Sequence, residues 1–424
     1  GSDQEPAEGS WLERTRRQAW DALVPENLSH SVSRDYVPVR KWQLVRDFLG
    51  SFSGSVALVA VMTAVGPANA GLAALSVAGL TVANVIWLKD RLAQVSHIAA
   101  TSIARVAERN PRPWIMAADV VQNVGTVLDA STAVLPPLVY YPLLTAVAAA
   151  RAVFGAASSA ASANIAPRQA LKGNLGEVSV KNSNQSTLTT LLGATAGTAA
   201  LGVLSASLGF GPAALIISAL GAGGCLVAEY MKLQALEYDP INERAMRRVL
   251  EQQEKDGTVP GPDRDLLGQM TDLLRPDQLI VGDRVRPLLE DPAFPELRQM
   301  YRDRPYFLAL RDGLPCIVLK QDAEAQDRPQ PMPEINVHPD NLAQVQAVYQ
   351  AVTAERLLEA PEFAARTERE GRAAAERWVL EESLRRTPSD IRPFMRELRE
   401  AGWSADMVRF RGEERPVLLS ETPA

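Results

Sequence analysis

Polar side chains concentrate in one strip of the chain, immediately before a long run without charged residues. An unpaired polar group that is buried costs about 1–3 kcal/mol, so such groups persist beside an apolar segment only where partners satisfy them. A carboxylate, an ammonium group, amides and hydroxyls occur together here, and together they could bind a small polar ligand. The members of this polar strip are Asn174, Glu177, Ser179, Lys181, Asn184, Gln185 and Ser186.

The end of the polar strip has the pattern of a helix N-terminus. Residues 183–186 precede the apolar run that starts at Thr187. At such an end the free backbone N–H groups and the helix dipole favour an anion. Lys172 and Lys181 are close in sequence, so a phosphate or carboxylate site is one prediction, and helix capping with satisfied polar packing is the alternative. Lys181 could also form a Schiff base with an aldehyde such as pyridoxal phosphate, although most lysines at helix ends are only solvated.

A second set of polar residues interrupts an apolar segment earlier in the chain. Their spacing of three, four and ten residues places them broadly on one face of a helix. Inside a membrane an ionisable residue indicates a functional site, whereas in a soluble bundle it is more often a hydrogen-bonded structural group. The set comprises Asp119, Gln122, Asn123 and Asp129.

Composition excludes several classes of protein. The chain has 424 residues and a net charge of -6, and no Lys/Arg-rich run with interleaved aromatic residues occurs, so a nucleic-acid partner is not expected. Two distant cysteines predict no disulfide framework, in keeping with a reducing compartment. The three histidines have no cysteine or carboxylate at ligand spacing, so no metal site is expected.

Three apolar stretches, each broken near its middle, predict three helical hairpins. They cover residues 48–88, 114–154 and 187–228, and basic residues flank them. If the hairpins cross a bilayer, every basic flank falls on one side, as the positive-inside rule requires. The stretches are rich in Ala, Gly, Ser and Thr, and a soluble bundle with buried central helices would also lack charge. Both alternatives, membrane-embedded and soluble helical core, follow from the pattern.

Charged residues return after the third stretch, with a hairpin signal around Asp312-Gly313. We therefore predict a mainly α protein, a helical-hairpin bundle followed by a small α+β region. The expected divisions are an N-terminal amphipathic or extended segment (residues 1–46), an apolar helical core (residues 47–235) and a charged α+β region (residues 236–424).

Several short motifs resemble those of the root UVB sensitive family, over nearly the whole chain. The central one is similar to the family pattern Asn-x-x-[Asp/Glu]-Val-Ser-x-Lys, followed by Gln-x-Thr. The matching segments are residues 24–28, 31–38, 87–90, 118–119 with Asn123 and Asp129, 174–181 and 185–187, the hairpin of residues 308–320 and the turn at 402–403.

The chain departs from the family pattern at three places. Residues 91–93 replace glycines that usually follow Asp90, Arg168 stands where a histidine is frequent, and Asn182-Ser183 replaces Asp-Gly. If those positions bind a ligand in relatives, this chain binds a different one.

The resemblance implies a role in vitamin B6 homeostasis, with which plant members of the family are associated. We expect a membrane-associated protein with a cytoplasmic C-terminal region that binds a small anionic metabolite such as pyridoxal phosphate. An oligomer with itself or with another family member is a further expectation. The ligand contacts expected are Asn123, Arg168, Asn174, Lys181, Asn184, Gln185 and Ser186, with Asp119 and Asn123 facing the polar strip.

Three other functions remain open on the same residues. An enzyme would use Asp119 or Glu177 as an acid–base catalyst, because burial raises the pKa of a carboxyl group. A transporter would carry the metabolite across the membrane. A structural scaffold would bind no small molecule at the strip. For the location, the alternative to a membrane-associated protein is a soluble cytoplasmic one.

Overall fold

The computed structural model divides the chain into two compact units, which are described separately. The first comprises Gly1–Glu237 with Asp265–Leu273, and the second Tyr238–Arg264 with Leu274–Ala424. The motif at residues 87–90 and the second half of the first predicted hairpin lie outside the described residues. The structure describes residues 22–26, 28–65, 107, 110–135, 137–163, 165–262, 265–271, 280–281, 294–311, 314–319 and 339–409.

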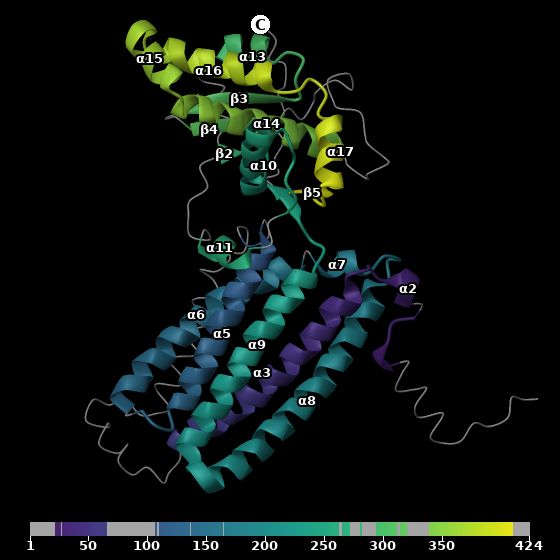
Figure 1. The fold of residues 1–424 in the computed structure, drawn as a ribbon, viewed down its shortest axis with the longest axis vertical. Helices are drawn as coiled ribbons and strands as arrows, with labels where there is room; N and C mark the ends of the chain where they lie inside the picture. Colours follow the sequence, from purple (N-terminus) through teal and green to yellow (C-terminus); the bar gives the residue numbers. More distant parts are fainter. Residues whose placement is uncertain are drawn as a thin grey trace, which may run out of the picture. The chain divides into compact units, whose positions relative to one another are not determined.

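Five long helices of the first unit lie side by side as a bundle (Figure 1). The central helix α3 packs against α8, α9 and α5, and α6 packs against α5. The elements of this unit are α2 (Leu28–Ser31), α3 (Tyr36–Val65), α5 (Pro111–Ser131), α6 (Pro137–Ala163), α7 (Ala166–Gln169), α8 (Leu175–Leu208), α9 (Phe210–Ala235) and α11 (Leu266–Thr271).

Two of the predicted helical hairpins are confirmed. Helix α5 ends at Ser131 and α6 begins at Pro137, close to the predicted break. Helices α8 and α9 meet at Gly209, whose φ of 79° is a backbone conformation that glycine adopts without strain. Short connections of this kind make neighbouring helices antiparallel, which gives the up-and-down order expected from the breaks.

The predicted helix start near Thr187 was wrong. Helix α8 already begins at Leu175, so the second half of the polar strip lies inside the helix and not at its N-terminus. Polar side chains such as Asn and Ser disrupt a helix when they bond the local backbone, but here several bond other segments instead. Tertiary partners therefore let the backbone of residues 182–186 continue as helix.

The N-terminal segment joins the bundle through a short extended contact. Val32 pairs with Ala170 as an isolated β-bridge, and both belong to a small cluster with Tyr36 and Val178. Helix α3 begins immediately afterwards at Tyr36, with Pro38 in its first turn, where the missing proline N–H has no helical partner to lose. The start of α3 is thereby held against the start of α8.

Glycines set the close approach of the central helices. A Cβ atom added at Gly193 or Gly197 would overlap the backbone carbonyl oxygen of Phe48 or Phe52 on α3. A Cβ at Gly221 on α9 would lie 2.7 Å from the Cβ of Ser53. Small residues at these spacings allow backbone-to-backbone packing, so Gly193 and Gly197 are packing residues.

The second unit is the α+β region expected from the sequence. The predicted hairpin is present as antiparallel strands β3 and β4, with β2 parallel to β4, and β1 pairs in parallel with β5. Its elements are β1 (Pro240–Asn242), α10 (Glu243–Asp256), β2 (Ile280–Val281), α13 (Phe294–Met300), β3 (Tyr306–Arg311), β4 (Leu314–Leu319), α14 (Pro339–Glu359), α15 (Pro361–Glu370), α16 (Arg372–Arg386), α17 (Arg392–Glu400) and β5 (Ser404–Arg409).

Helix α14 forms the centre of this second core. It packs on strands β3 and β4 and on α16. Its buried Gln350 accepts a hydrogen bond from the Tyr306 hydroxyl (2.9 Å) and donates one to the Tyr301 hydroxyl (2.6 Å). Burial raises the pKa of both tyrosines, so they stay neutral and the buried amide remains satisfied.

The glycine contacts predict a position-specific effect of one added methyl group. Gly197→Ala should lower the free energy of unfolding by about 1–3 kcal/mol, because the methyl group would push α8 away from the Phe52 carbonyl. Thermal unfolding of the detergent-purified chain measures this. Gly202→Ala is the matched control on the same helix, where an added Cβ meets nothing within 4 Å. It should be neutral or stabilising by up to about 1 kcal/mol. Equal effects at the two positions would contradict the packing account.

Candidate functional site

Arg46 is the centre of a buried ionic site in the first unit. Its Nη2 lies 2.6 Å from Asp119 Oδ1 on α5, and its Nε lies 3.3 Å from Glu229 Oε2 on α9. A third carboxylate, Asp47, is 3.6 Å from Nη1. The side chains of Asp119 and Glu229 are only 2% and 1% exposed, whereas Arg46 is 33% exposed. One guanidinium group therefore connects three helices.

The site continues from Arg46 along α9. Lys232 Nζ lies 2.6 Å from Glu229 Oε1 and donates a hydrogen bond of 3.0 Å to Gln43 on α3. Gln43 in turn donates to Asp47 (2.7 Å). Among the described residues, no donor makes a hydrogen bond of good geometry to either carboxylate oxygen of Glu229. Glu229 is therefore held by the charges of its two cationic neighbours, Arg46 and Lys232.

The site also continues from α3 to the polar strip on α8. Asp47 accepts a hydrogen bond from Ser186 Oγ (2.7 Å). Arg40 donates to Ser186 Oγ (2.9 Å), to Gln185 Oε1 (2.6 Å) and to the carbonyl oxygen of Asn182. Serine and amide side chains on α8 thus bind charged side chains on α3.

These contacts form one connected set across four helices, which we name the ionic layer. Its three cations and three carboxylates balance in charge, as burial requires, since an unpaired buried charge costs several kcal/mol. The ionic layer consists of Arg40, Gln43, Arg46, Asp47, Asp119, Asn123, Asn182, Gln185, Ser186, Glu229 and Lys232.

Asp119 is the best-buried carboxyl group among the residues predicted from sequence. Asn123 donates to its Oδ2 (2.9 Å) and to its backbone carbonyl (2.8 Å), so these two residues act together as predicted from their spacing. Both carboxylate oxygens of Asp119 already have a protein partner.

The prediction that Asp119, Gln122, Asn123 and Asp129 share one helical face is only partly correct. Asp129 pairs with Arg151 on α6 (2.7 Å) and not with the ionic layer, and the Gln122 side chain is exposed. Ten residues of helix leave Asp129 rotated by about 80° from Asp119, which is enough to face another helix. Gly125 leaves room for Arg151, whose guanidinium would overlap a Cβ atom there.

Three residues of the polar strip hold the chain's own N-terminal segment. Gln185 donates to the carbonyl oxygen of Leu23, and Asn184 donates to that of Ala22 (3.1 Å). Glu177 accepts the backbone N–H of Glu26 (2.9 Å) and pairs with Lys181 (2.8 Å). Segment 22–26 therefore lies along the strip.

The remaining predicted residues lie at the start of α8. Asn174 is the residue before the helix, but its side chain makes no capping hydrogen bond, and its Oδ1 is buried with no donor among the described residues. Arg168 lies in the short helix α7. Asp119 and Asn123 contact Arg46, whereas Gln185 and Ser186 contact Arg40, so the two predicted groups are joined through α3.

Sequence reasoning missed five charged residues of the ionic layer as site residues. A signal for them existed in the charge pattern, because Asp47 is the last charge before one uncharged run and Glu229 is the first charge after another. Such positions resemble ordinary solvated helix ends, and only their packing shows that they pair. The missed residues are Arg40, Arg46, Asp47, Glu229 and Lys232.

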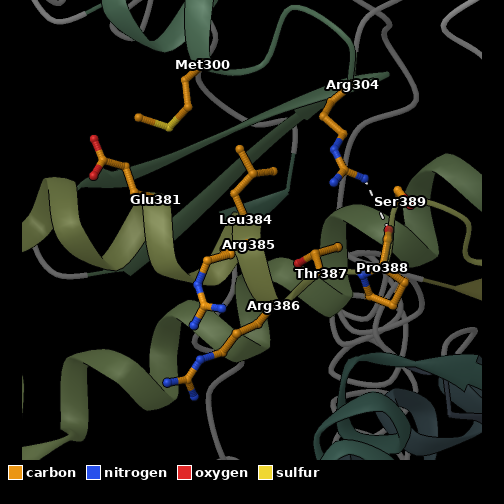
Figure 2. A pocket seen from close by; sticks show the side chains of 9 residues that line it. All are labelled: Met300, Arg304, Glu381, Leu384, Arg385, Arg386, Thr387, Pro388 and Ser389. Atoms are coloured by element: carbon orange, nitrogen blue, oxygen red, sulfur yellow. Dashed lines mark hydrogen bonds between the residues drawn. The ribbon is translucent and has the colours of Figure 1, made fainter.

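A separate open pocket of about 560 Å³ lies in the second unit (Figure 2). Arg304 donates to the carbonyl oxygen of Pro388 there (3.2 Å), and Arg385 and Arg386 both pair with Glu382. Hydrogen bonds from these two arginines lower the pKa of Glu382 to about 2. Glu382 already pairs with two of the arginines that line the pocket. For this reason we assign no ligand to the pocket.

The helices and the ionic layer together define a class of protein. Among the described residues, no three metal-ligating side chains are grouped closely enough to hold a metal ion. Within the described ranges, four helices are long and apolar enough to cross a membrane by length and composition. These are Tyr36–Thr63, Thr145–Gln169, Leu175–Leu208 and Phe210–Ala235. The class is an apolar helical bundle with paired charges at one level, as in membrane-associated proteins.

Comparison with known families identifies the family. The model of the vitamin B6 photo-protection and homoeostasis domain matches residues 10–256, which is more than half of the chain. The chain therefore belongs to the root UVB sensitive family, and the resemblance found in the sequence motifs is confirmed. The match covers residues 10–237 of the first unit and ends at the last residue of α10, so most of the second unit lies beyond it, as does α11.

Individual relatives are distant. Protein root UVB sensitive 3 of Arabidopsis thaliana is 23% identical over 331 residues, which cover 73% of this chain and 72% of that protein. Protein root UVB sensitive 2, chloroplastic, of the same plant is 23% identical, covering 72% and 69%. RUS family member 1 of Dictyostelium discoideum is 23% identical over 175 residues, covering 41% of this chain and 32% of that protein. No solved structure matches.

The ionic layer predicts that Arg46 stabilises the bundle. Arg46→Met should lower the free energy of unfolding by about 3–5 kcal/mol, because it leaves the buried Asp119 carboxylate without its cation, whereas Glu229 keeps Lys232. Adding Asp119→Asn should restore part of this loss by removing the unpaired charge. Denaturant unfolding in detergent measures both.

Lys41→Met is the control, since this neighbouring lysine on α3 is exposed and should change stability by less than about 0.5 kcal/mol. If Arg46→Met has no larger effect than Lys41→Met, the ionic layer does not hold the helices together.

Proposed function

We propose that this chain is a membrane-associated protein of vitamin B6 homeostasis that binds a small anionic metabolite at the polar strip of α8. Membership of the family supports the link to vitamin B6. The ligand and the membrane topology are inferred from the residues of the first unit. The single observation that carries the binding proposal is the concentration of cationic and amide groups where α3 meets the start of α8.

The apolar outer surface of the bundle supports the membrane part. Large apolar side chains that are more than half exposed lie on three of the four candidate membrane helices. Isolated exposed apolar residues are ordinary, but a series along several adjacent helices marks a surface that avoids water. They include Leu58 and Met62 on α3, Leu191, Leu192 and Val203 on α8, and Leu220 and Val227 on α9.

Charge placement supports an orientation. Helices α3 and α8 begin, and α9 ends, at the level of Arg40, Lys181 and Lys232, whereas the opposite turn at Gly209 is uncharged. Under the positive-inside rule the basic end is cytoplasmic. The C-terminal region follows directly from that end of α9, so it would be cytoplasmic as well.

The chemistry of a vitamin B6 phosphate fits the groups of the polar strip. Its phosphate would pair with the Lys181 ammonium, and its ring hydroxyl and aldehyde would bond the amides of Asn184 and Gln185. The hydrogen bonds that hold segment 22–26 involve backbone atoms, which a ligand can replace one for one. Ligand binding would therefore displace this segment from α8.

Native mass spectrometry of the detergent-purified full chain with pyridoxal phosphate tests the proposal. One molecule should bind, and Lys181→Met should weaken the dissociation constant by about 10- to 100-fold, since a charge-assisted hydrogen bond contributes about 1.5–3 kcal/mol. Lys172→Met is the matched control, because this nearby lysine is exposed and lies before α8. Binding that is absent, or weakened equally by both substitutions, would refute a site at the strip.

A transporter is the second candidate, favoured by paired charges buried between apolar helices. It predicts flux of pyridoxal phosphate into vesicles that contain the protein.

The enzyme alternative requires a carboxyl group that can exchange a proton with a substrate. Asp119 is the candidate, and both of its carboxylate oxygens are bonded, one to Arg46 and the other to Asn123. Asp119→Asn would abolish turnover and retain binding if Asp119 were the catalyst.

A further inference from the structure

We infer that the ionic layer marks one boundary of the bilayer hydrocarbon and that the turn at Gly209 marks the other. This placement rests on the proposed membrane function and adds to it the depth of each helix. It assigns the exposed apolar faces of α3, α8 and α9 to lipid acyl chains.

The contacts show that the ionic layer lies at one level of the bundle. Helix α8 runs parallel to α3, because Asp47 contacts Ser186 and Ser55 contacts Ala194. Helix α9 runs antiparallel to α3, since Arg46 contacts Glu229 while Ser53, further along α3, contacts Ser218. Arg46 and Asp47 on α3 therefore occupy the same height as Ser186 on α8 and Glu229 on α9.

The apolar segments beyond the ionic layer have the thickness of a bilayer core. At 1.5 Å per residue, the 18 residues from Asp47 to the end of α3 span about 27 Å, and the 22 from Ser186 to Leu208 span about 33 Å. The segment from Phe210 to Ala228 spans about 27 Å. The hydrocarbon core of a typical bilayer is about 30 Å thick.

The segments of these helices that lie inside the proposed boundary carry no charge. Residues 48–65, 182–208 and 210–228 contain no charged side chain. The Asp129–Arg151 pair lies beyond Asp119 on the α5–α6 side, and its two charges neutralise each other at 2.7 Å. Arg151 also bonds the Gln122 carbonyl and the Thr126 hydroxyl, so its charge is satisfied inside the protein as a membrane requires.

Residues typical of the membrane–water interface lie on the other side of Arg46 and Glu229. The Lys41 ammonium is 5.7 Å from the ring centre of Trp42, which lies about one turn before Arg46 on α3. Tyr230, at the same level on α9, is 38% exposed. Tryptophan and tyrosine at headgroup depth, with lysine reaching into water, anchor membrane helices at this level.

Individual exposed residues then have defined depths. Leu58 lies 11 residues beyond Asp47 and Leu220 lies nine before Glu229, so both should be about 14–16 Å inside the boundary, near the bilayer centre. Val180 lies six residues before Ser186, which places it about 9 Å outside the hydrocarbon. All three are more than half exposed, so burial in protein does not distinguish them.

Spin-label accessibility in vesicles of phosphatidylcholine and phosphatidylglycerol tests these depths. Labels are placed by Leu58→Cys, Leu220→Cys and Val180→Cys in full chains in which Ala replaces Cys225 and Cys316, which are both buried. Collision with oxygen relative to a water-soluble nickel chelate should be several-fold greater at positions 58 and 220 than at 180. Hydroxyl-radical footprinting of the unsubstituted chain in the same vesicles should modify Val180 and spare Leu58 and Leu220, without any substitution.

The outcomes separate the inference from the proposed function. If positions 58 and 220 prefer the nickel chelate, the chain is not embedded, and both fail. If oxygen access is high but is greatest at position 180, the chain is embedded at another depth and only the boundary is overturned. Spin–spin broadening at position 220 would show that a second copy, and not lipid, covers α9, which also overturns the inference.

Discussion

The bundle depends on the pairing of Arg46 with carboxylates from two other helices. Asp119 and Glu229 are almost completely buried, and neither could remain ionised there without a cation. Because Arg46 lies on the central helix α3, the same contact fixes the height of α5 and α9 against it. Asp47, next in sequence, extends this height to α8 through Ser186. One pair of adjacent residues thus aligns four helices.

Close packing of small residues is the condition that makes this alignment specific. Apolar helices slide easily along one another, and the glycines of α8 and α9 remove that freedom by letting backbones touch at defined points. Gly193 and Gly197 follow Ser186 on the same helix and pack on Phe48 and Phe52, one and five residues beyond Asp47. Polar pairing at one end and backbone contact along the length therefore specify the same register.

The polar strip has two roles in the fold that bear on its proposed function. One face bonds Arg40 and Asp47 and so belongs to the ionic layer, while Asn184 and Glu177 hold the backbone of segment 22–26. The first set is tied to buried charges and is costly to disturb. The second consists of exposed hydrogen bonds to a peptide segment, which exchange at little cost. A ligand would therefore enter beside segment 22–26 and leave the ionic layer intact.

Much of the architecture follows from the order of residues alone. Long uncharged runs broken by Gly209 and by the prolines before α6 indicate helical hairpins, because no other element buries so many apolar residues between such breaks. The start of α8 and the cationic partner of Asp119 could not be predicted. Both depend on side chains more than 70 residues distant in sequence, such as Arg46 and Arg40, and local preference carries no information about contacts that arise only when helices pack.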